Sequence, residues 1–205
     1  DQLKQTELVP FASAIEAGAD LIMTAHITIP LIDDEKAYDG VSNYPATMSH
    51  KALTDILRGD MGYTGVVVTD ALEMAALYET PLVAGGGATA EERKASAEYG
   101  ANLAERVINA GADILLLPTD LNTATAATYY DDYIAALAQK AQSDSALADR
   151  IDESVTRILT LKKEYDVLDK DVSGKDIEQK VAIAESTIGS QAHHNTETAI
   201  AKQAI

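Results

Sequence analysis

The sequence predicts an α/β fold built around a parallel sheet, and three short apolar segments carry this prediction. They read LIMTA at 21–25, VVVT at 66–69 and ILLLP at 114–118. Each is a run of apolar or β-branched residues without the alternation of a half-buried strand, which is typical of strands covered on both faces. Each run also follows a segment with helical spacing, and alternating helices and buried strands indicate a parallel sheet.

An internal repeat supports this organisation. The segments AGADLIMTAH (17–26) and AGADILLLPT (110–119) share a glycine turn, an aspartate and an apolar strand, and GYTGVVVTD (62–70) is a looser third copy. In the first two copies the glycine stands where a left-handed residue commonly ends a helix. We interpret the aspartates of these two turns, Asp20 and Asp113, as structural.

Helical spacing of apolar residues accounts for most of the remaining chain. An apolar pattern restarts after Asp70, where Leu72 and Met74 begin a predicted helix. The segment DKDVSGKD at 169–176 has the composition of a linker. The predicted helices cover residues 7–17, 49–61, 90–110, 147–168, 177–188 and 196–205. The fourth of them has Ile151, Val155, Ile158 and Leu161 on one face, which should be buried.

Composition narrows the function classes. The 33 acidic and 16 basic residues give a net charge of −17, which repels nucleic acid and anionic membrane surfaces. The absence of cysteine excludes disulfides, thiolate chemistry and cysteine-ligated metal. No apolar run is long enough for a membrane-spanning helix. The 205 residues, 46% of them hydrophobic, suffice for one packed domain or for one domain plus an appendage.

Polar side chains stand at the carboxyl end of each predicted strand. His26 follows the first, Asp70 the second, and Thr119 with Asp120 the third. In a doubly wound sheet or a (β/α)8 barrel, both of which fit the pattern, these ends share one rim where chemistry collects. A partly screened carboxylate suits nucleophilic or general-base work, so Asp70 is the leading catalytic candidate. The alternative is that Asp70 caps the following helix.

Other interpretations of the polar residues stay open. His26, alone at a strand end, is equally consistent with a structural hydrogen-bonding residue. His26, Asp70 and Asp120 have the donor types of a metal-dependent hydrolase, although no two of them have a short metal-binding spacing. Arg58 is expected to pair with an acidic residue on the helix surface.

Four longer segments carry a family signature: ELVPFASAIEAGADLIMTAHI (7–27), YPATMSHKALTDILRGDMGYTGVVVTDALEM (44–74), VINAGADILLLP (107–118) and RIDESVTRILTLKKEYDVL (150–168). Together they resemble glycoside hydrolase family 3, and more narrowly its β-N-acetylhexosaminidase branch. The resemblance covers roughly residues 3–168, and the residues TDALEM after the second strand favour this branch.

The resemblance implies a fold and an activity. Residues 1–168 would form the carboxyl-terminal portion of a (β/α)8 TIM barrel, and 169–205 a helical linker that begins a second α/β/α domain. The implied enzyme is a retaining exo-β-N-acetylglucosaminidase acting on cell-wall or chitin-type glycans, without cofactor or metal. Asp70 would be the nucleophile, with His26 shaping the sugar subsite and Met74 packing at its edge. An extracellular or cell-surface bacterial location is also implied.

The family's acid/base, a histidine assisted by an aspartate, has no counterpart here. No DSH-like stretch and no KH pair occurs in the 205 residues. We therefore expect the chain to be part of a longer two-domain enzyme and to need its partner for turnover. Three strands would leave open sheet edges, so we also expect association with the amino-terminal half of the barrel or self-association. A non-catalytic half-barrel that serves as a binding or scaffold piece is a further alternative.

Overall fold

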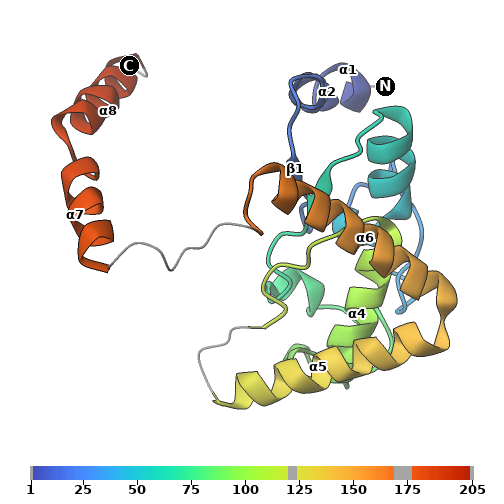
Figure 1. Cartoon of the computed structure of the whole chain (residues 1–205). Coiled ribbons are helices and arrows are strands. Elements are labelled where there is room, and N and C mark those ends of the chain that lie inside the picture. Colours follow the sequence, from blue (N-terminus) through green and yellow to red (C-terminus); the bar gives the residue numbers. More distant parts are fainter. Residues whose placement is uncertain (1, 120–123, 169–176, 204–205) are drawn as a thin grey trace. The chain divides into compact units, whose positions relative to one another are not determined.

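The computed structural model describes residues 2–119, 124–168 and 177–203. They form two compact units that divide between Glu164 and Tyr165 (Figure 1). The second unit holds α7 (Ile177–Thr187) and α8 (Gln191–Gln203), which match the two predicted helices although α8 begins earlier. Among the described helices, none combines the length and the apolar character that a membrane span requires.

The first unit is built around a short parallel sheet, as predicted. Strand β1 (Leu21–Met23) pairs in parallel with β2 (Val66–Val68), with Leu21 opposite Val66. The third predicted strand is reduced to a single parallel bridge between Val68 and Ile114. The ladder ends there because the next amide in register, that of Leu116, donates to the side-chain Oγ1 of Thr69 at 3.0 Å.

Helices precede each strand. Helices α1 (Gln2–Gln5) and α2 (Leu8–Glu16) lie before β1, and α2 gives way to Gly18 in a left-handed conformation. The helix before β2, η2 (Lys51–Asp60), winds as a π-helix, and the Met61 amide that follows it donates to the Ile56 carbonyl at 2.9 Å.

The single helix predicted over 90–110 is wrong, because the chain breaks at Ser96. Two helices form instead, α3 (Ala90–Ala95) and α4 (Ala97–Ala110). Ser96 has extended backbone angles, and its side-chain oxygen accepts a hydrogen bond from the Tyr99 amide at 3.1 Å. A serine in this position caps the second helix, and this favours a new start over continuation.

The helix predicted directly after Asp70 is also wrong. The chain makes a turn at 71–74 and then only a short 3₁₀-helix, η3 (Ala75–Leu77). The amides of Leu72 and Glu73 donate to the carbonyls of Leu116 and Leu117 at 2.9 and 3.0 Å. These contacts fix the turn against the neighbouring strand segment.

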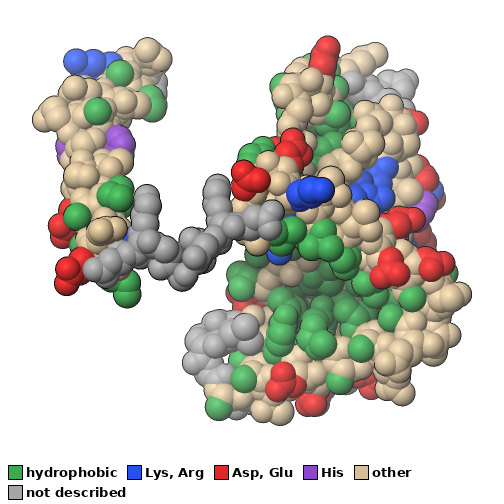
Figure 2. All heavy atoms as spheres, viewed as in Figure 1, with side chains coloured by type: hydrophobic (Ala, Val, Ile, Leu, Met, Phe, Trp, Pro, Cys, Tyr) green, Lys and Arg blue, Asp and Glu red, His purple; other side chains and the backbone are tan. Residues whose placement is uncertain are grey.

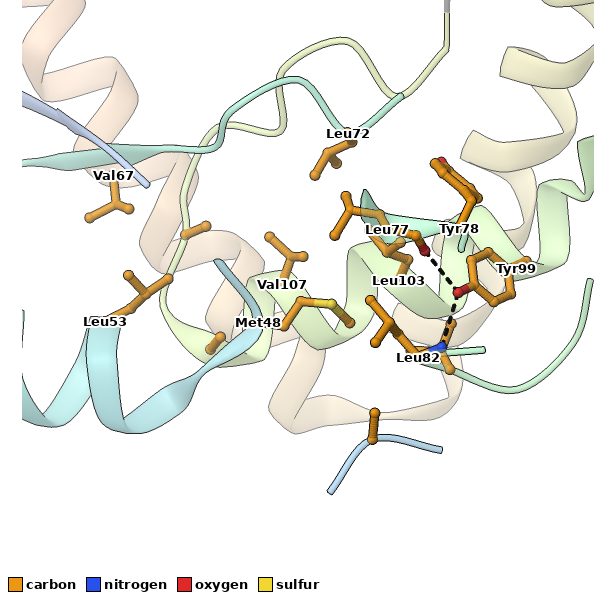
Figure 3. Close-up of a cluster of buried hydrophobic side chains, with 14 of the residues drawn as sticks. Met48, Leu53, Val67, Leu72, Leu77, Tyr78, Leu82, Tyr99, Leu103 and Val107 are labelled. Atoms are coloured by element: carbon orange, nitrogen blue, oxygen red, sulfur yellow. Dashed lines mark hydrogen bonds between the residues drawn. The ribbon is translucent and has the colours of Figure 1, made fainter. Parts of the chain in front are cut away.

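Helix α4 lies at the centre of the main core (Figure 3). Its Leu103 and Val107 pack with Met48 of the 3₁₀-helix η1 (Ala46–Met48) and with side chains from β2, η2 and the segment after Asp70. The buried Tyr99 hydroxyl donates to the Leu77 carbonyl at 3.0 Å and accepts from the Leu82 amide at 3.2 Å. These bonds tie the segment after η3 to the core.

Two long helices complete the first unit, α5 (Ala124–Ser143) and α6 (Ser145–Glu164). The predicted apolar face of α6 is only partly correct, since Val155 is 45% exposed while Leu147 and Ser154 are buried. This helix face is oriented by polar contacts instead, because the Asp113 carboxylate, just before the third strand segment, is contacted by Arg150, Ser154 and Arg157.

Candidate active site at the carboxyl ends of the strands

Asp70 directly follows β2 and its buried neighbour Thr69, and its side chain is half-buried. Its Oδ1 accepts a hydrogen bond from the Ala71 amide at 2.8 Å. A helix cap would instead bind an amide two or three residues into a helix, and η3 begins only at Ala75, after Met74. Asp70 therefore does not cap a helix, and its carboxylate lies at the end of a buried parallel strand.

The neighbouring segment at the end of the third predicted strand has a strained backbone, and its carbonyl groups bind the turn after Asp70. Leu117 has a φ of +44°, a left-handed conformation that costs a leucine about 1–2 kcal/mol. Its carbonyl accepts the Glu73 amide, and the carbonyl of Leu116 accepts that of Leu72. Strained backbone of this kind persists only where surrounding contacts hold it, and it is concentrated at functional sites.

His26 is brought to the residue that follows Asp70. Its Nε2 lies 3.0 Å from the Ala71 carbonyl oxygen, and its Nδ1 lies 3.0 Å from the Thr47 hydroxyl. The Thr47 hydroxyl is in turn 2.7 Å from that of Thr24. Both ring nitrogens of His26 therefore have protein partners, and the ring links the end of β1 to the turn after β2.

The two threonines were not singled out in the sequence. Thr24 could have been, because it precedes His26 by two residues in an extended segment and so shares its side of the strand. Thr47 lies in η1, 21 residues from His26, and no local pattern connects them. Arg106 of α4 fixes η1 from outside: its Nε donates to the Met48 carbonyl at 3.0 Å.

Two further candidate residues from the sequence are Met74 and Asp120. Met74 is 42% exposed and immediately precedes η3. Asp120, the third donor of the metal alternative, lies outside the described residues. Within the described ranges, no three His, Asp or Glu side chains are grouped as a metal site would require.

A second polar cluster surrounds Asp113 at the opposite, amino-terminal end of the strands. Its Oδ2 accepts from Arg58 at 2.6 Å and from the Val67 amide at 2.9 Å, and its Oδ1 accepts from Ser154 at 2.8 Å. Arg157 and Arg150 donate to Oδ1 at 3.0 and 3.1 Å.

These contacts fix the charge of Asp113. Burial alone would raise the pKa of this carboxyl, but the hydrogen bonds from Val67 and Ser154 and the nearby guanidinium groups outweigh it and lower the pKa. The interpretation of Asp113 as structural agrees with this geometry. Arg58 does pair with an acid, but the acid is this buried aspartate and not one on the helix surface.

The position of the cavities does not by itself identify the carboxyl ends of the strands as the candidate site. A cavity of about 470 Å³, lined by Asp20, Tyr63 and Arg157 among others, lies at the amino-terminal end of the strands. In βα-repeat folds that end serves stability and the carboxyl end serves chemistry. The strand ends at His26 and Asp70 therefore define the candidate site.

The comparisons with known proteins agree with this fold. The family model for the glycosyl hydrolase family 3 N terminal domain matches residues 1–161. Beta-hexosaminidase A of Pseudoalteromonas piscicida is 32% identical over 211 residues, which cover 100% of this chain and 31% of that protein. A beta-hexosaminidase of Chromobacterium violaceum is 34% identical over 151 residues, 74% of this chain and 33% of that protein. The chain thus spans about a third of the length of these relatives.

Solved structures give the same family. The glycoside hydrolase family 3 beta-N-acetylglucosaminidase from Paenibacillus sp. str. FPU-7 is 32% identical with a TM-score of 0.58, over 79% of this chain and 25% of that one. The beta-N-acetylhexosaminidase from Beutenbergia cavernae DSM 12333 is 31% identical with a TM-score of 0.53, over 75% of this chain and 36% of that one. The parallel βα units are thus part of a TIM barrel, and the chain belongs to glycosyl hydrolase family 3.

Proposed function

We propose that Asp70 is the nucleophile of a retaining exo-β-N-acetylhexosaminidase that acts on N-acetylglucosamine-containing glycans of the cell-wall or chitin type. The observation that carries the proposal is the position of Asp70, a half-buried carboxylate at the carboxyl end of β2 that caps no helix, in a chain of this family. The names of the relatives, beta-hexosaminidase and beta-N-acetylglucosaminidase, support the substrate class.

The proposed chemistry uses Asp70 twice. Its carboxylate attacks the anomeric carbon while a general acid protonates the departing oxygen, and a covalent glycosyl-aspartate forms. Water, deprotonated by the former general acid, then attacks the same carbon. The bond from that carbon to Asp70 breaks, so the carboxylate is regenerated and the sugar leaves with its original configuration. We assign the acid/base to a histidine loop, which these 205 residues do not contain, so the chain supplies the nucleophile and a partner segment supplies the proton.

His26 and Met74 are proposed to shape the sugar subsite. Because both nitrogens of His26 bind protein atoms, the ring can offer a sugar its face or its carbon edge. Met74 offers a flexible thioether side chain, which suits packing against the apolar face of a sugar ring. No step of this chemistry requires a metal or an organic cofactor, so EDTA should leave the activity unchanged.

We further propose that residues 1–168 belong to the barrel, that 169–205 lead to a second domain, and that the barrel is completed by the preceding βα units or by a second copy. Strand β1 lies at the edge of the described sheet, and its Leu21 and Met23 are 49% and 54% exposed. Hydrophobic side chains also gather on the face of the first unit between α5 and α6 (Figure 2). Such a surface favours association, and a monodisperse monomer in light scattering would count against this part.

The test is intact mass spectrometry with a 5-fluoro-N-acetylglucosaminyl fluoride, which accumulates the glycosyl-enzyme. The chain is incubated alone and with a polypeptide that carries the preceding βα units of the family domain. We expect one added sugar on Asp70 in the complemented sample, none on Asp70→Asn, and unchanged labelling of Asp55→Asn, a matched exposed aspartate of η2. Labelling of Asp70→Asn at the wild-type level would refute the nucleophile assignment.

A further inference from the structure

Four polar groups form a continuous series of hydrogen bonds that ends at Ala71, next to Asp70. It runs from Thr24 to Thr47 at 2.7 Å, from Thr47 to His26 Nδ1 at 3.0 Å, and from His26 Nε2 to the Ala71 carbonyl at 3.0 Å. The chain joins β1, η1 and the turn after β2, which lie far apart in the sequence. It ends on the residue next to the proposed nucleophile.

The proton positions along this chain follow from its last acceptor. A carbonyl oxygen only accepts, so His26 Nε2 carries the hydrogen, and in the neutral ring Nδ1 is then an acceptor. The Thr47 hydroxyl must donate to Nδ1, and since it has a single proton it accepts from Thr24. Each member of the neutral chain thus has one defined role, which fixes the orientation of the imidazole ring.

Burial restricts the two threonines at the start of this hydrogen-bonded series. Thr47 is fully buried and Thr24 is 8% exposed, so neither hydroxyl can readily exchange its partner for water. Helix η1 is also held by its backbone, because the Ala46 amide donates to the Ile27 carbonyl at 2.8 Å. The ring of His26 is therefore set by a hydroxyl that cannot move far.

The far end of the chain reaches Asp70 through Ala71. His26 holds the Ala71 carbonyl, and Asp70 Oδ1 accepts from the Ala71 amide at 2.8 Å. On the other side of the turn, the amide of Leu72 is bound by the Leu116 carbonyl. The turn that carries the carboxylate is thus pinned between η1 and the third strand segment.

We propose that Thr47 is a positioning residue for Asp70, acting through the His26 ring and the Ala71 carbonyl. This inference rests on the proposed role of Asp70 as nucleophile. It assigns His26 to alignment of the nucleophile in addition to any contact with sugar. Misplacement of a nucleophile by about 1 Å can lower a rate about 100-fold, so loss of the Thr47 hydroxyl should act on the rate and not on substrate binding.

The test compares Thr47→Val, which removes the hydroxyl at nearly constant shape, with Thr47→Ser, which keeps it. Thr54→Val is the matched control, because its hydroxyl donates to the Ala110 carbonyl in a different part of the unit. Thr24→Val is a second, milder variant, because it leaves the Thr47-to-His26 bond in place. It provides the comparison if Thr47→Val does not fold.

Two readouts are measured on each variant. The first is kinetic: kcat and KM for a chromogenic N-acetylglucosaminide in the complemented sample. The second needs no activity: ¹³C-carbonyl alanine with ¹⁵N-leucine labelling selects the five Ala–Leu peptides of the sequence, including Ala71–Leu72, while Ala146–Leu147 in α6 serves as internal reference.

We expect Thr47→Val to lower kcat about 10- to 100-fold with KM within about threefold, Thr24→Val to have a smaller effect, and Thr47→Ser to stay near wild type. The Ala71–Leu72 resonance should shift in the same order. An unchanged Ala71–Leu72 resonance in Thr47→Val overturns the proposal even if no enzyme activity exists. Equal losses of kcat in Thr47→Val and Thr54→Val overturn it as well. Normal labelling of Asp70→Asn would refute the proposed function and with it the catalytic meaning of this inference, while the shift of the Ala71–Leu72 resonance would still report the structural link from Thr47 to Ala71.

Discussion

Replacement of Asp113 by asparagine should destabilise the chain more than any change at its surface. The carboxylate is buried between β2, η2 and α6, and it accepts from Arg58, Arg150 and Arg157 as well as from Val67 and Ser154. Asparagine keeps the shape, but it removes the negative charge and turns an NH₂ group toward atoms that are themselves donors. The three guanidinium groups then lose their shared counter-ion.

The size of the effect follows from the partners that are left behind. Removal of one member of a buried, hydrogen-bonded ion pair costs about 3–5 kcal/mol, because the remaining charge stays buried without compensation. For a chain of this size each kcal/mol lowers Tm by about 2–4 °C, so Asp113→Asn should lower Tm by about 6–20 °C. The matched control is Glu153→Gln, whose exposed carboxylate pairs with Arg157 at 3.4 Å and should cost less than about 1 kcal/mol.

The pH dependence gives an independent check. The folded-state pKa of Asp113 is lowered, so its contribution is fully present above the unfolded-state pKa of about 3.9 and is lost as the pH falls through the folded-state value. Urea unfolding followed by circular dichroism should therefore show a constant difference between wild type and Asp113→Asn from neutral pH down to mildly acidic pH, and a shrinking difference below about pH 4. Equal stability losses in Asp113→Asn and Glu153→Gln would refute the reasoning.

Three further substitutions test the packing. Gly111→Ala should destabilise by about 1–3 kcal/mol in urea unfolding, because Gly111 has a φ of +128° and a Cβ there would lie 2.9 Å from Thr54 Oγ1 and 3.1 Å from Leu53 Cβ. Gly62→Ala, with a φ of +69° and open space, should cost less. Tyr129→Phe should be neutral or stabilise by up to about 1 kcal/mol, since this buried hydroxyl has no hydrogen-bond partner within the described structure; a loss above that size would contradict this account.

The parallel sheet could be predicted because its signal is local. Runs such as VVVT are read from adjacent residues, and the repeated glycine turn predicts the helix ends, as the left-handed Gly18 and Gly111 confirm. The break at Ser96 was also readable in principle, because serine is a common helix cap, but the long apolar periodicity of 90–110 outweighed it. Where a capping residue and an apolar periodicity favour different helix boundaries, sequence alone does not decide between them.

The turn after Asp70 could not be predicted, because the contacts that hold it are distant in sequence. The amides of Leu72 and Glu73 are taken by carbonyls more than 40 residues away. The same holds for the link between His26 and Thr47 and for the convergence of arginines on Asp113. Sequence predicts which residues stand at the ends of the strands, but the side-chain partners that orient them depend on the tertiary fold.

The two aspartates at opposite ends of the sheet show how that environment divides structure from chemistry. Asp113 accepts five hydrogen bonds, three of them from guanidinium groups, so its oxygens are saturated and its charge is spread over fixed partners. Among the described residues, Asp70 has one hydrogen bond to its side chain, from its own neighbour, so oxygen lone pairs remain for an incoming carbon. A nucleophile needs that freedom and a structural anchor does not. Asp70→Asn should accordingly cost little stability while Asp113→Asn costs much.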